Sequence, residues 1–266
     1  MDTAESLVTV EMRDDGCAVV TLQRPQALNA LTRSMRTQLA RAFAQLAAEG
    51  TQVVVLTGAG RAFCAGLDLR ELSTSENLAE LAVSGAVDDP VHAVLGFPGP
   101  VVAAVNGPAV TGGLELALAC DLLIASDRAT FADTHARVGV IPSWGMSQRM
   151  PRLIGRARAL EMSLTGNFVS AQQAQAWGLA NRVVPHEELL ATALGLAGDM
   201  LSAAPGMLAQ YKRLVDDGLA GTLEQGLRLE GQRSREWAAS LDRSAIAARR
   251  EAVQARGKAS QPGRGA

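Results

Sequence analysis

The chain has 266 residues, and its 25 lysines and arginines nearly balance its 27 aspartates and glutamates, giving a formal net charge of −2. This balance excludes a broad basic face for nucleic acid or for an anionic membrane. Aromatic residues make up only 3% of the chain, too few for a base-stacking surface. Hydrophobic residues make up 48%, so the chain can bury a sizeable core. No run of about 18 apolar residues is present, and no membrane span is predicted.

Residues that bind metals or form disulfides are few and scattered. The three cysteines are Cys17, Cys64 and Cys120, and the three histidines are His92, His135 and His186. Their spacing matches neither a disulfide framework nor a set of metal ligands, so we predict buried thiols and no metal. The first residues carry acids and no long apolar run. These features are typical of a reduced, cytoplasmic protein.

Short β-rich runs alternate with helical runs in the first half of the chain. We predict strands over 8–12, 18–22, 53–57, 101–105 and 122–125. The last three are continuous apolar runs, which are typical of strands covered on both faces. Leu39, Phe43 and Leu46 recur at helical spacing, and a second, apolar helix is predicted over 114–120. The alternation indicates an α/β fold.

Helical patterns dominate after about residue 145, where the one clear strand signal covers 182–184. Helices are predicted over 171–177, 187–201, 207–217, 223–239 and 244–255, followed by a disordered tail of about a dozen residues. The irregular segment 71–100 is interpreted as a mobile lid or pocket wall. We therefore divide the chain into a core over 1–195 and a C-terminal helical region over 196–266.

The segment 60–68 follows a buried strand and is rich in small residues. Small residues let backbone groups approach a ligand closely, but a tight turn between a strand and a helix explains them equally well. The preceding Gly58-Ala59-Gly60 begins a dinucleotide-binding pattern, yet Phe63 stands where its third glycine belongs. A dinucleotide site is therefore a weak hypothesis.

A second candidate segment begins with Gly112 and Gly113, which follow a buried strand and open an apolar helix. The first turn of a helix has unpaired N–H groups, so the Gly112 N–H can stabilise a developing oxyanion. Glu115 lies three residues on, nearly on the same helical face. Its carboxylate either serves chemistry beside that donor or merely complements the helix dipole.

The ordered motifs together resemble the crotonase superfamily, also called enoyl-CoA hydratase/isomerase. The resemblance is carried by 24–31, 62–69, 103–107, 112–117, 120–121, 141–142, 148–149, 164–166 and 174–180. Each motif is weak by itself, but the set extends over nearly the whole chain. The resemblance implies an α/β fold built as a spiral of ββα repeats, with a C-terminal helical region that makes trimers or dimers of trimers. It also implies an acyl-CoA substrate and no separate cofactor, because coenzyme A belongs to the substrate.

The resemblance also implies roles for individual residues. Backbone N–H groups of Ala65 and Gly112 are expected to form an oxyanion hole for the thioester. The residues expected to bind the CoA thioester are Ala62, Ala65, Gly66, Leu67, Asp68, Gly112 and Trp144. Trp144 is expected to be a wall of the acyl pocket that limits chain length.

Hydratases of this family use two glutamates, and only one of them matches a glutamate here. Glu115 matches the first, whereas His135 replaces the second, in the segment 131–135. Histidine can act as acid or base near neutral pH, or it can be a structural substitute. Asp133 lies two residues before His135, so it does not occupy the position of the family's second glutamate.

These residues predict an enzyme that adds water across the double bond of a 2-enoyl-CoA through an oxyanion-stabilised enolate. Glu115 is the principal acid/base and His135 the second catalytic group. A double-bond isomerase and a weakly catalytic acyl-CoA-binding protein are the alternatives.

Overall fold

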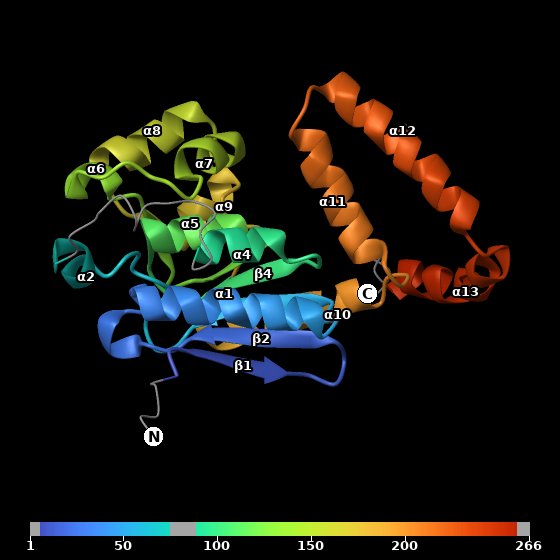
Figure 1. Cartoon of the computed structure of the whole chain (residues 1–266), viewed down its shortest axis with the longest axis horizontal. Helices are drawn as coiled ribbons and strands as arrows, with labels where there is room; N and C mark the ends of the chain where they lie inside the picture. Colours follow the sequence, from blue (N-terminus) through green and yellow to red (C-terminus); the bar gives the residue numbers. More distant parts are fainter. Residues whose placement is uncertain (1–5, 75–88, 260–266) are drawn as a thin grey trace, which may run out of the picture. The chain divides into compact units, whose positions relative to one another are not determined.

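The computed structural model describes residues 6–74 and 89–259, and the chain divides into two compact units (Figure 1). The first unit is Met1–Gln210 and the second is Tyr211–Ala266. The division expected from the sequence, after residue 195, falls inside helix α10 (Leu189–Leu201). This helix packs on strands β3, β4 and β6 of the main sheet, so all of it lies in the first unit.

Six strands form the main sheet, in the order β1-β2-β3-β4-β6-β9. They are β1 (Val8–Met12), β2 (Cys17–Leu22), β3 (Val53–Gly58), β4 (Val101–Val105), β6 (Leu122–Ser126) and β9 (Arg182–Val184). β1 and β2 are antiparallel, and the other neighbouring pairs are parallel. A smaller sheet, ordered β5-β7-β8, contains β5 (Ala109–Val110), β7 (Thr130–Ala132) and β8 (Val169–Ser170). The predicted strands of the main sheet are confirmed to within one residue at each end.

Alternate residues of β3 point to opposite faces of the main sheet. Val54 and Leu56 belong to the larger core cluster, which also contains the apolar face of helix α1 (Arg33–Ala48). Val53 and Val55 belong to a smaller cluster that also contains residues of α10. Burial on both faces is the reason for the continuous apolar run in this strand.

Helix α5 (Gly112–Ala119) lies in the core, and all eight of its residues are buried. Strand β5 leads into this helix, and the Thr111 N–H donates a hydrogen bond to the Ala132 carbonyl of β7 (2.8 Å). Because α5 begins immediately after this contact, the short pairing of β5 with β7 decides where the first N–H groups of the helix lie.

The remaining helices of the described residues lie mostly after residue 134. They are η1 (Pro25–Ala27), α2 (Leu69–Thr74), α4 (Pro90–Gly96), α6 (His135–Val138), α7 (Met146–Ile154), α8 (Arg156–Thr165), α9 (Ala171–Trp177), η2 (His186–Glu188), α11 (Met207–Leu219), α12 (Leu223–Ser240) and α13 (Arg243–Ala259). The sequence patterns miss α7 and α8, because Pro151 inside α7 and Gly155 between the two interrupt the helical signal.

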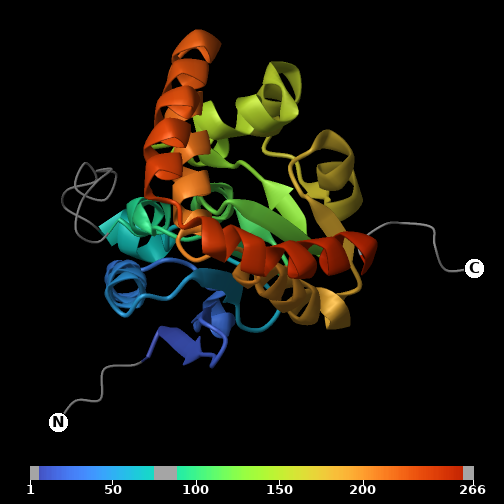
Figure 2. The same cartoon turned by 90° about the vertical axis from the view of Figure 1, so that its right-hand side faces the viewer.

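Two expectations fall partly outside the described residues. The segment 71–100, interpreted as a lid, begins in α2 and contains α4, but residues 75–88 lie outside the description. Helix α13 continues through the first residues of the expected disordered tail, and residues 260–266 lie outside the description. The second unit consists of α12, α13 and most of α11 (Figure 2). Within the described ranges, no helix is long and apolar enough to cross a membrane.

Gly113 marks a close approach between α5 and the preceding chain, since an added Cβ would lie 2.0 Å from the Cys64 carbonyl oxygen. We expect Gly113→Ala to lower the free energy of unfolding by about 1–3 kcal/mol, because backbone has to shift to admit the methyl group. Gly195→Ala is the matched control, in the middle of α10 with no atom within 4 Å of the added Cβ. It is expected to raise the free energy by about 0.4–1 kcal/mol. Urea denaturation of both variants measures these changes, and equal stabilities would contradict the close approach.

Candidate active site

A cavity of about 130 Å³ lies at the start of α5. Its lining includes Ala65, Leu67, Gly112, Glu115, His135 and Trp144. The fold therefore brings together six of the predicted site residues, from segments as far apart as 65–67 and 135–144. A larger cavity of about 470 Å³ adjoins it, and His135 lines both, whereas Asp133 and Ser163 line only the larger one.

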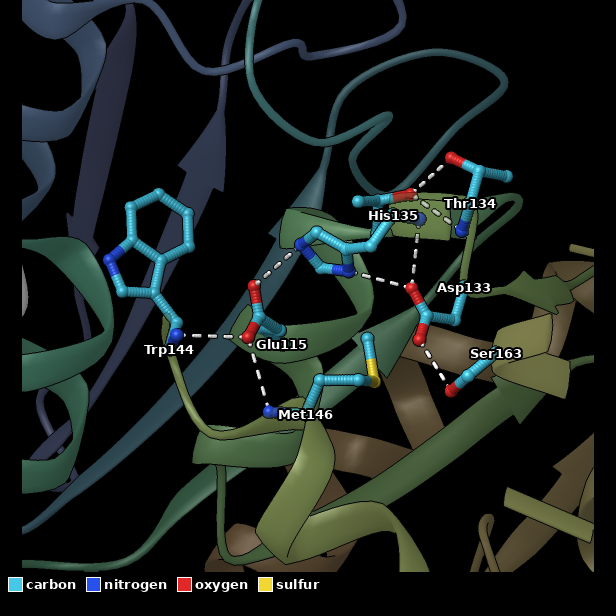
Figure 3. Close-up of polar contacts among 8 residues, drawn as sticks. Glu115, Asp133, Thr134, His135, Trp144, Met146 and Ser163 are labelled. Atoms are coloured by element: carbon cyan, nitrogen blue, oxygen red, sulfur yellow. Dashed lines mark hydrogen bonds and ion pairs between the residues drawn. The ribbon is translucent and has the colours of Figure 1, made fainter. Parts of the chain in front are cut away.

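Glu115 is only 2% exposed, and its carboxylate is held by backbone donors. Its Oε1 accepts hydrogen bonds from the N–H groups of Trp144 (2.9 Å) and Met146 (3.1 Å). Its Oε2 lies 3.6 Å from Nε2 of His135 (Figure 3). That separation is too long for a direct hydrogen bond, so both atoms can still form a hydrogen bond with another group.

Burial has the largest effect on the pKa of Glu115. Removal from water raises the pKa of this carboxyl group above its ordinary value, and the negative charge of Asp133 adds to the effect. The N–H groups of Met146 and Trp144 and the charge of His135 oppose it without cancelling it. A buried carboxyl group with a raised pKa and a titratable neighbour is typical of a proton-transfer site.

His135 is held by Asp133. The Oδ1 atom of Asp133 accepts hydrogen bonds from the His135 backbone N–H (3.1 Å) and lies 2.6 Å from Nδ1 of its ring. Oδ2 of the same aspartate accepts a hydrogen bond from Oγ of Ser163, on α8 (2.6 Å). Burial alone would raise the pKa of Asp133, but the hydrogen bonds from His135 and Ser163 outweigh it and hold the pKa below its ordinary value. The four side chains form a continuous series of polar contacts, from Glu115 to His135, then to Asp133 and then to Ser163 (Figure 3).

One expected oxyanion donor is corrected by the structure. The Ala65 N–H donates to the Leu28 carbonyl (3.0 Å), so it is not free for a thioester oxygen. Gly66, at φ +93°, turns the chain, and in the bridge to Leu31 the groups that pair are the Gly66 carbonyl and the Asp68 N–H. The intervening Leu67 N–H points away from Leu31 and has no hydrogen-bond acceptor in the described part of the chain.

The free N–H groups of Leu67 and Gly112 lie near one another. Both residues line the cavity, and a Cβ added at Gly66 would lie 3.2 Å from the Gly112 nitrogen. Gly112 is the first residue of α5, so its N–H has no partner within the helix. The pair of backbone donors is therefore Leu67 and Gly112 rather than Ala65 and Gly112.

Two further residues expected to bind CoA have structural partners. The Ala62 carbonyl accepts hydrogen bonds from the side-chain amides of Asn29 (2.8 Å) and Asn106 (3.2 Å), which occupy both of its lone pairs. Asp68 pairs with Arg24 (2.5 Å), and its carboxylate also accepts bonds from backbone N–H groups at the start of α2. The side-chain hydrogen bond from Arg24 is the main reason why the pKa of Asp68 is lowered. Neither residue lines the cavity.

The chain has clear relatives. The enoyl-CoA hydratase/isomerase family model matches residues 12–255. A probable peroxisomal enoyl-CoA hydratase of Arabidopsis thaliana is 39% identical over 255 residues, which cover 96% of this chain and 95% of that protein. The chain belongs to the enoyl-CoA hydratase/isomerase family. Its match to a mevalonyl-coenzyme A hydratase of Beauveria bassiana is 39% identical over 234 residues, 78% of this chain and 84% of that protein.

Solved structures agree with this membership in the enoyl-CoA hydratase/isomerase family. The crystal structure of an enoyl-CoA hydratase from Bacillus anthracis matches with a TM-score of 0.85 at 34% identity, covering 91% of this chain and 95% of that chain. The family and the crotonase fold predicted from the sequence are thus confirmed. Within the described residues, no group of three or more histidine, cysteine, aspartate or glutamate side chains is arranged to hold a metal ion.

Sequence reasoning missed three features of this site: the donor role of Leu67, the contact between Asp133 and His135, and Ser163 altogether. Leu67 is recognised as a donor only once the turn at Gly66 is known. Asp133 is two residues from His135, and the pair meets because the chain turns into α6 between them. Ser163 is 30 residues from Asp133 in the chain, and no local signal connects them.

The raised pKa of Glu115 predicts how stability changes with pH. A carboxyl group that binds its proton more tightly in the folded state favours folding below its unfolded-state pKa, and that contribution is lost as the pH rises through the folded-state pKa. We therefore expect the free energy of unfolding of the wild type to fall relative to Glu115→Gln as the pH rises from 4.5, the ordinary glutamate value, toward neutrality. Urea denaturation across this range measures the difference. A pH-independent gap between the two proteins would contradict the raised pKa.

Proposed function

We propose that this protein is an enoyl-CoA hydratase that adds water across the double bond of a 2-enoyl-CoA thioester. The observation that carries the proposal is the buried Glu115 carboxylate, whose Oε2 faces His135 Nε2 beside two free backbone donors. Relatives named enoyl-CoA hydratase over most of the chain support the same reaction. Coenzyme A is part of the substrate, and the proposed reaction requires no other cofactor.

The N–H groups of Leu67 and Gly112 are proposed to hold the thioester oxygen. When water adds to the β carbon, electrons move toward this oxygen and an enolate forms. Two preorganised donors stabilise the developing negative charge, and the start of α5 adds its partial positive charge. This part of the mechanism needs only backbone groups, so it is independent of the two acid/base side chains.

Glu115 and His135 are proposed to move the protons. The Glu115 carboxylate accepts a proton from water as the water oxygen bonds to the β carbon. The proton that Glu115 has taken up passes to Nε2 of His135, which carries no proton in the neutral ring, and from Nε2 to the α carbon. In the balance, one water is consumed, its hydroxyl bonds to the β carbon and the α carbon gains one hydrogen.

Double-bond isomerisation is the alternative reaction. It needs one base that moves a proton between two carbons, and Glu115 by itself could serve. The second titratable side chain, 3.6 Å from Glu115, favours hydration instead. Trimeric or hexameric assembly and a cytoplasmic location stay predictions, and the Arabidopsis relative is named as peroxisomal.

Glu115→Gln tests the acid/base assignment with crotonyl-CoA as substrate. We expect kcat to fall by about 10²–10⁴-fold, because the amide cannot accept a proton from water. The dissociation constant for the thioester should stay within about 3-fold, because the backbone donors remain. Loss of enoyl absorbance, product mass and calorimetry measure these quantities.

The matched control for this experiment is Glu187→Gln, at an exposed glutamate of η2. A near-normal rate for Glu115→Gln would show that Glu115 is not the base. Binding without any gain of water by the wild type would move the assignment to isomerisation or to acyl-CoA binding.

Trp144 is proposed to limit the length of the acyl group. Its ring is buried, lines the cavity and lies 3.1 Å from the position of a Cβ added at Gly112. Removing the ring enlarges the cavity, so Trp144→Ala should raise kcat/KM for 2-octenoyl-CoA relative to crotonyl-CoA by about 10-fold or more.

Trp177→Ala is the control, because Trp177 lines neither cavity and lies under Arg158. Kinetics with the two substrates measure the preference of each variant. An unchanged preference in Trp144→Ala would exclude the tryptophan as a determinant of chain length.

A further inference from the structure

We propose that Asp133, held by Ser163, is a positioning residue that keeps a proton on Nδ1 of His135. Nε2 is then left available for proton transfer in the smaller cavity, of about 130 Å³, at the start of α5. This inference rests on the proposed hydratase function for its catalytic meaning. Its structural content, the tautomer of one histidine, stands independently of that function.

Asp133 orients His135 through two contacts with a single oxygen. Oδ1 accepts the backbone N–H of His135 at 3.1 Å and lies 2.6 Å from ring atom Nδ1. An ionised carboxylate can only accept hydrogen bonds, so Nδ1 has to be the donor. The other ring nitrogen, Nε2, then faces Oε2 of Glu115 at 3.6 Å. The aspartate thus decides both the direction of the ring and which nitrogen is left for chemistry.

Ser163 prevents the aspartate from turning. Its hydroxyl donates to Oδ2 at 2.6 Å, so both carboxylate oxygens of Asp133 are engaged by the protein. The residues come from different elements, with Asp133 directly after β7 and Ser163 on α8. Asp133 is 1% exposed and His135 is 8% exposed, which keeps water from competing for these bonds.

Asp133 acts through His135 rather than on the substrate. The smaller cavity is lined by His135 but not by Asp133, which lines only the larger adjoining cavity. The aspartate therefore does not replace the missing family glutamate as a second carboxylate at the reacting carbons. Instead, it acts on the ring of His135, by fixing its direction and the nitrogen that carries the proton.

The tautomer of His135 is the direct test. Nitrogen NMR resolves the ring nitrogens, and the chain has only three histidines, so His92→Gln and His186→Gln assign the signals. In the wild type we expect the neutral ring of His135 to be protonated on Nδ1. In Asp133→Asn the population protonated on Nε2 should rise, because the neutral amide no longer favours a proton on Nδ1. An unchanged tautomer would overturn the proposal.

Kinetics with crotonyl-CoA test the catalytic meaning. Asp133→Asn should lower kcat by about 10-fold or more with KM within about 2-fold, as expected when only the orientation of the acid/base group is lost. In a His135→Gln background the same change should alter kcat by less than about 2-fold, because the residue through which Asp133 acts is gone. An equal loss in both backgrounds would identify Asp133 as merely structural and overturn its positioning role.

Ser163→Ala keeps the proposal falsifiable if Asp133→Asn fails to fold. It should lower kcat by about 3-fold, whereas the control Ser147→Ala, at a serine that lines the same larger cavity, should leave kcat unchanged. Equal rates for the two serine variants would contradict the role of Ser163. If the wild type hydrates no enoyl-CoA but Asp133→Asn shifts the tautomer, the hydratase proposal fails and the positioning of His135 stands.

Discussion

The buried carboxylate of Glu115 is the constraint on which the site depends. It lies on a helix with no exposed residue, where an unmatched charge is costly. The N–H groups of Trp144 and Met146 stabilise the buried carboxylate by hydrogen bonds, and the ring of His135 lies beside it. These contacts join the start of α5 to the start of α7, to the chain just before it, and to the start of α6. The interactions that make the burial tolerable therefore also build the walls of the cavity.

The backbone around Gly66 supplies the second part of the site. In this turn the Ala65 N–H donates to the Leu28 carbonyl, whereas Leu67, which lines the cavity, has no acceptor for its N–H in the described part of the chain. A backbone donor is available for a ligand only if the fold leaves it unpaired, as it does for the Leu67 N–H within the described residues. The two donors near Glu115 thus come from two unrelated segments that the fold brings to one place.

His135 gives the site other charges than the two glutamates that the sequence resemblance implies. The ring of His135 lies between Glu115 and Asp133, two carboxyl groups whose pKa values move in opposite directions, up for Glu115 and down for Asp133. Opposite shifts are what a site needs if one group is to exchange protons while another stays ionised. The histidine and the aspartate are best understood together, because Asp133 holds the backbone and the ring of His135.

The sequence by itself determined the α/β class, the strands of the main sheet, the family and the helix that carries Glu115. These features depend on local periodicity and on ordered motifs, which are written along the chain. The sequence did not predict α7 and α8, because a proline and a glycine obscure their pattern. Only the tertiary structure decided that Leu67 rather than Ala65 has the free N–H, and that Ser163 holds Asp133 against His135. Those facts depend on hydrogen bonds between residues as far as 37 positions apart, from Leu28 to Ala65. Such pairings are set by packing, and neither composition nor spacing records them.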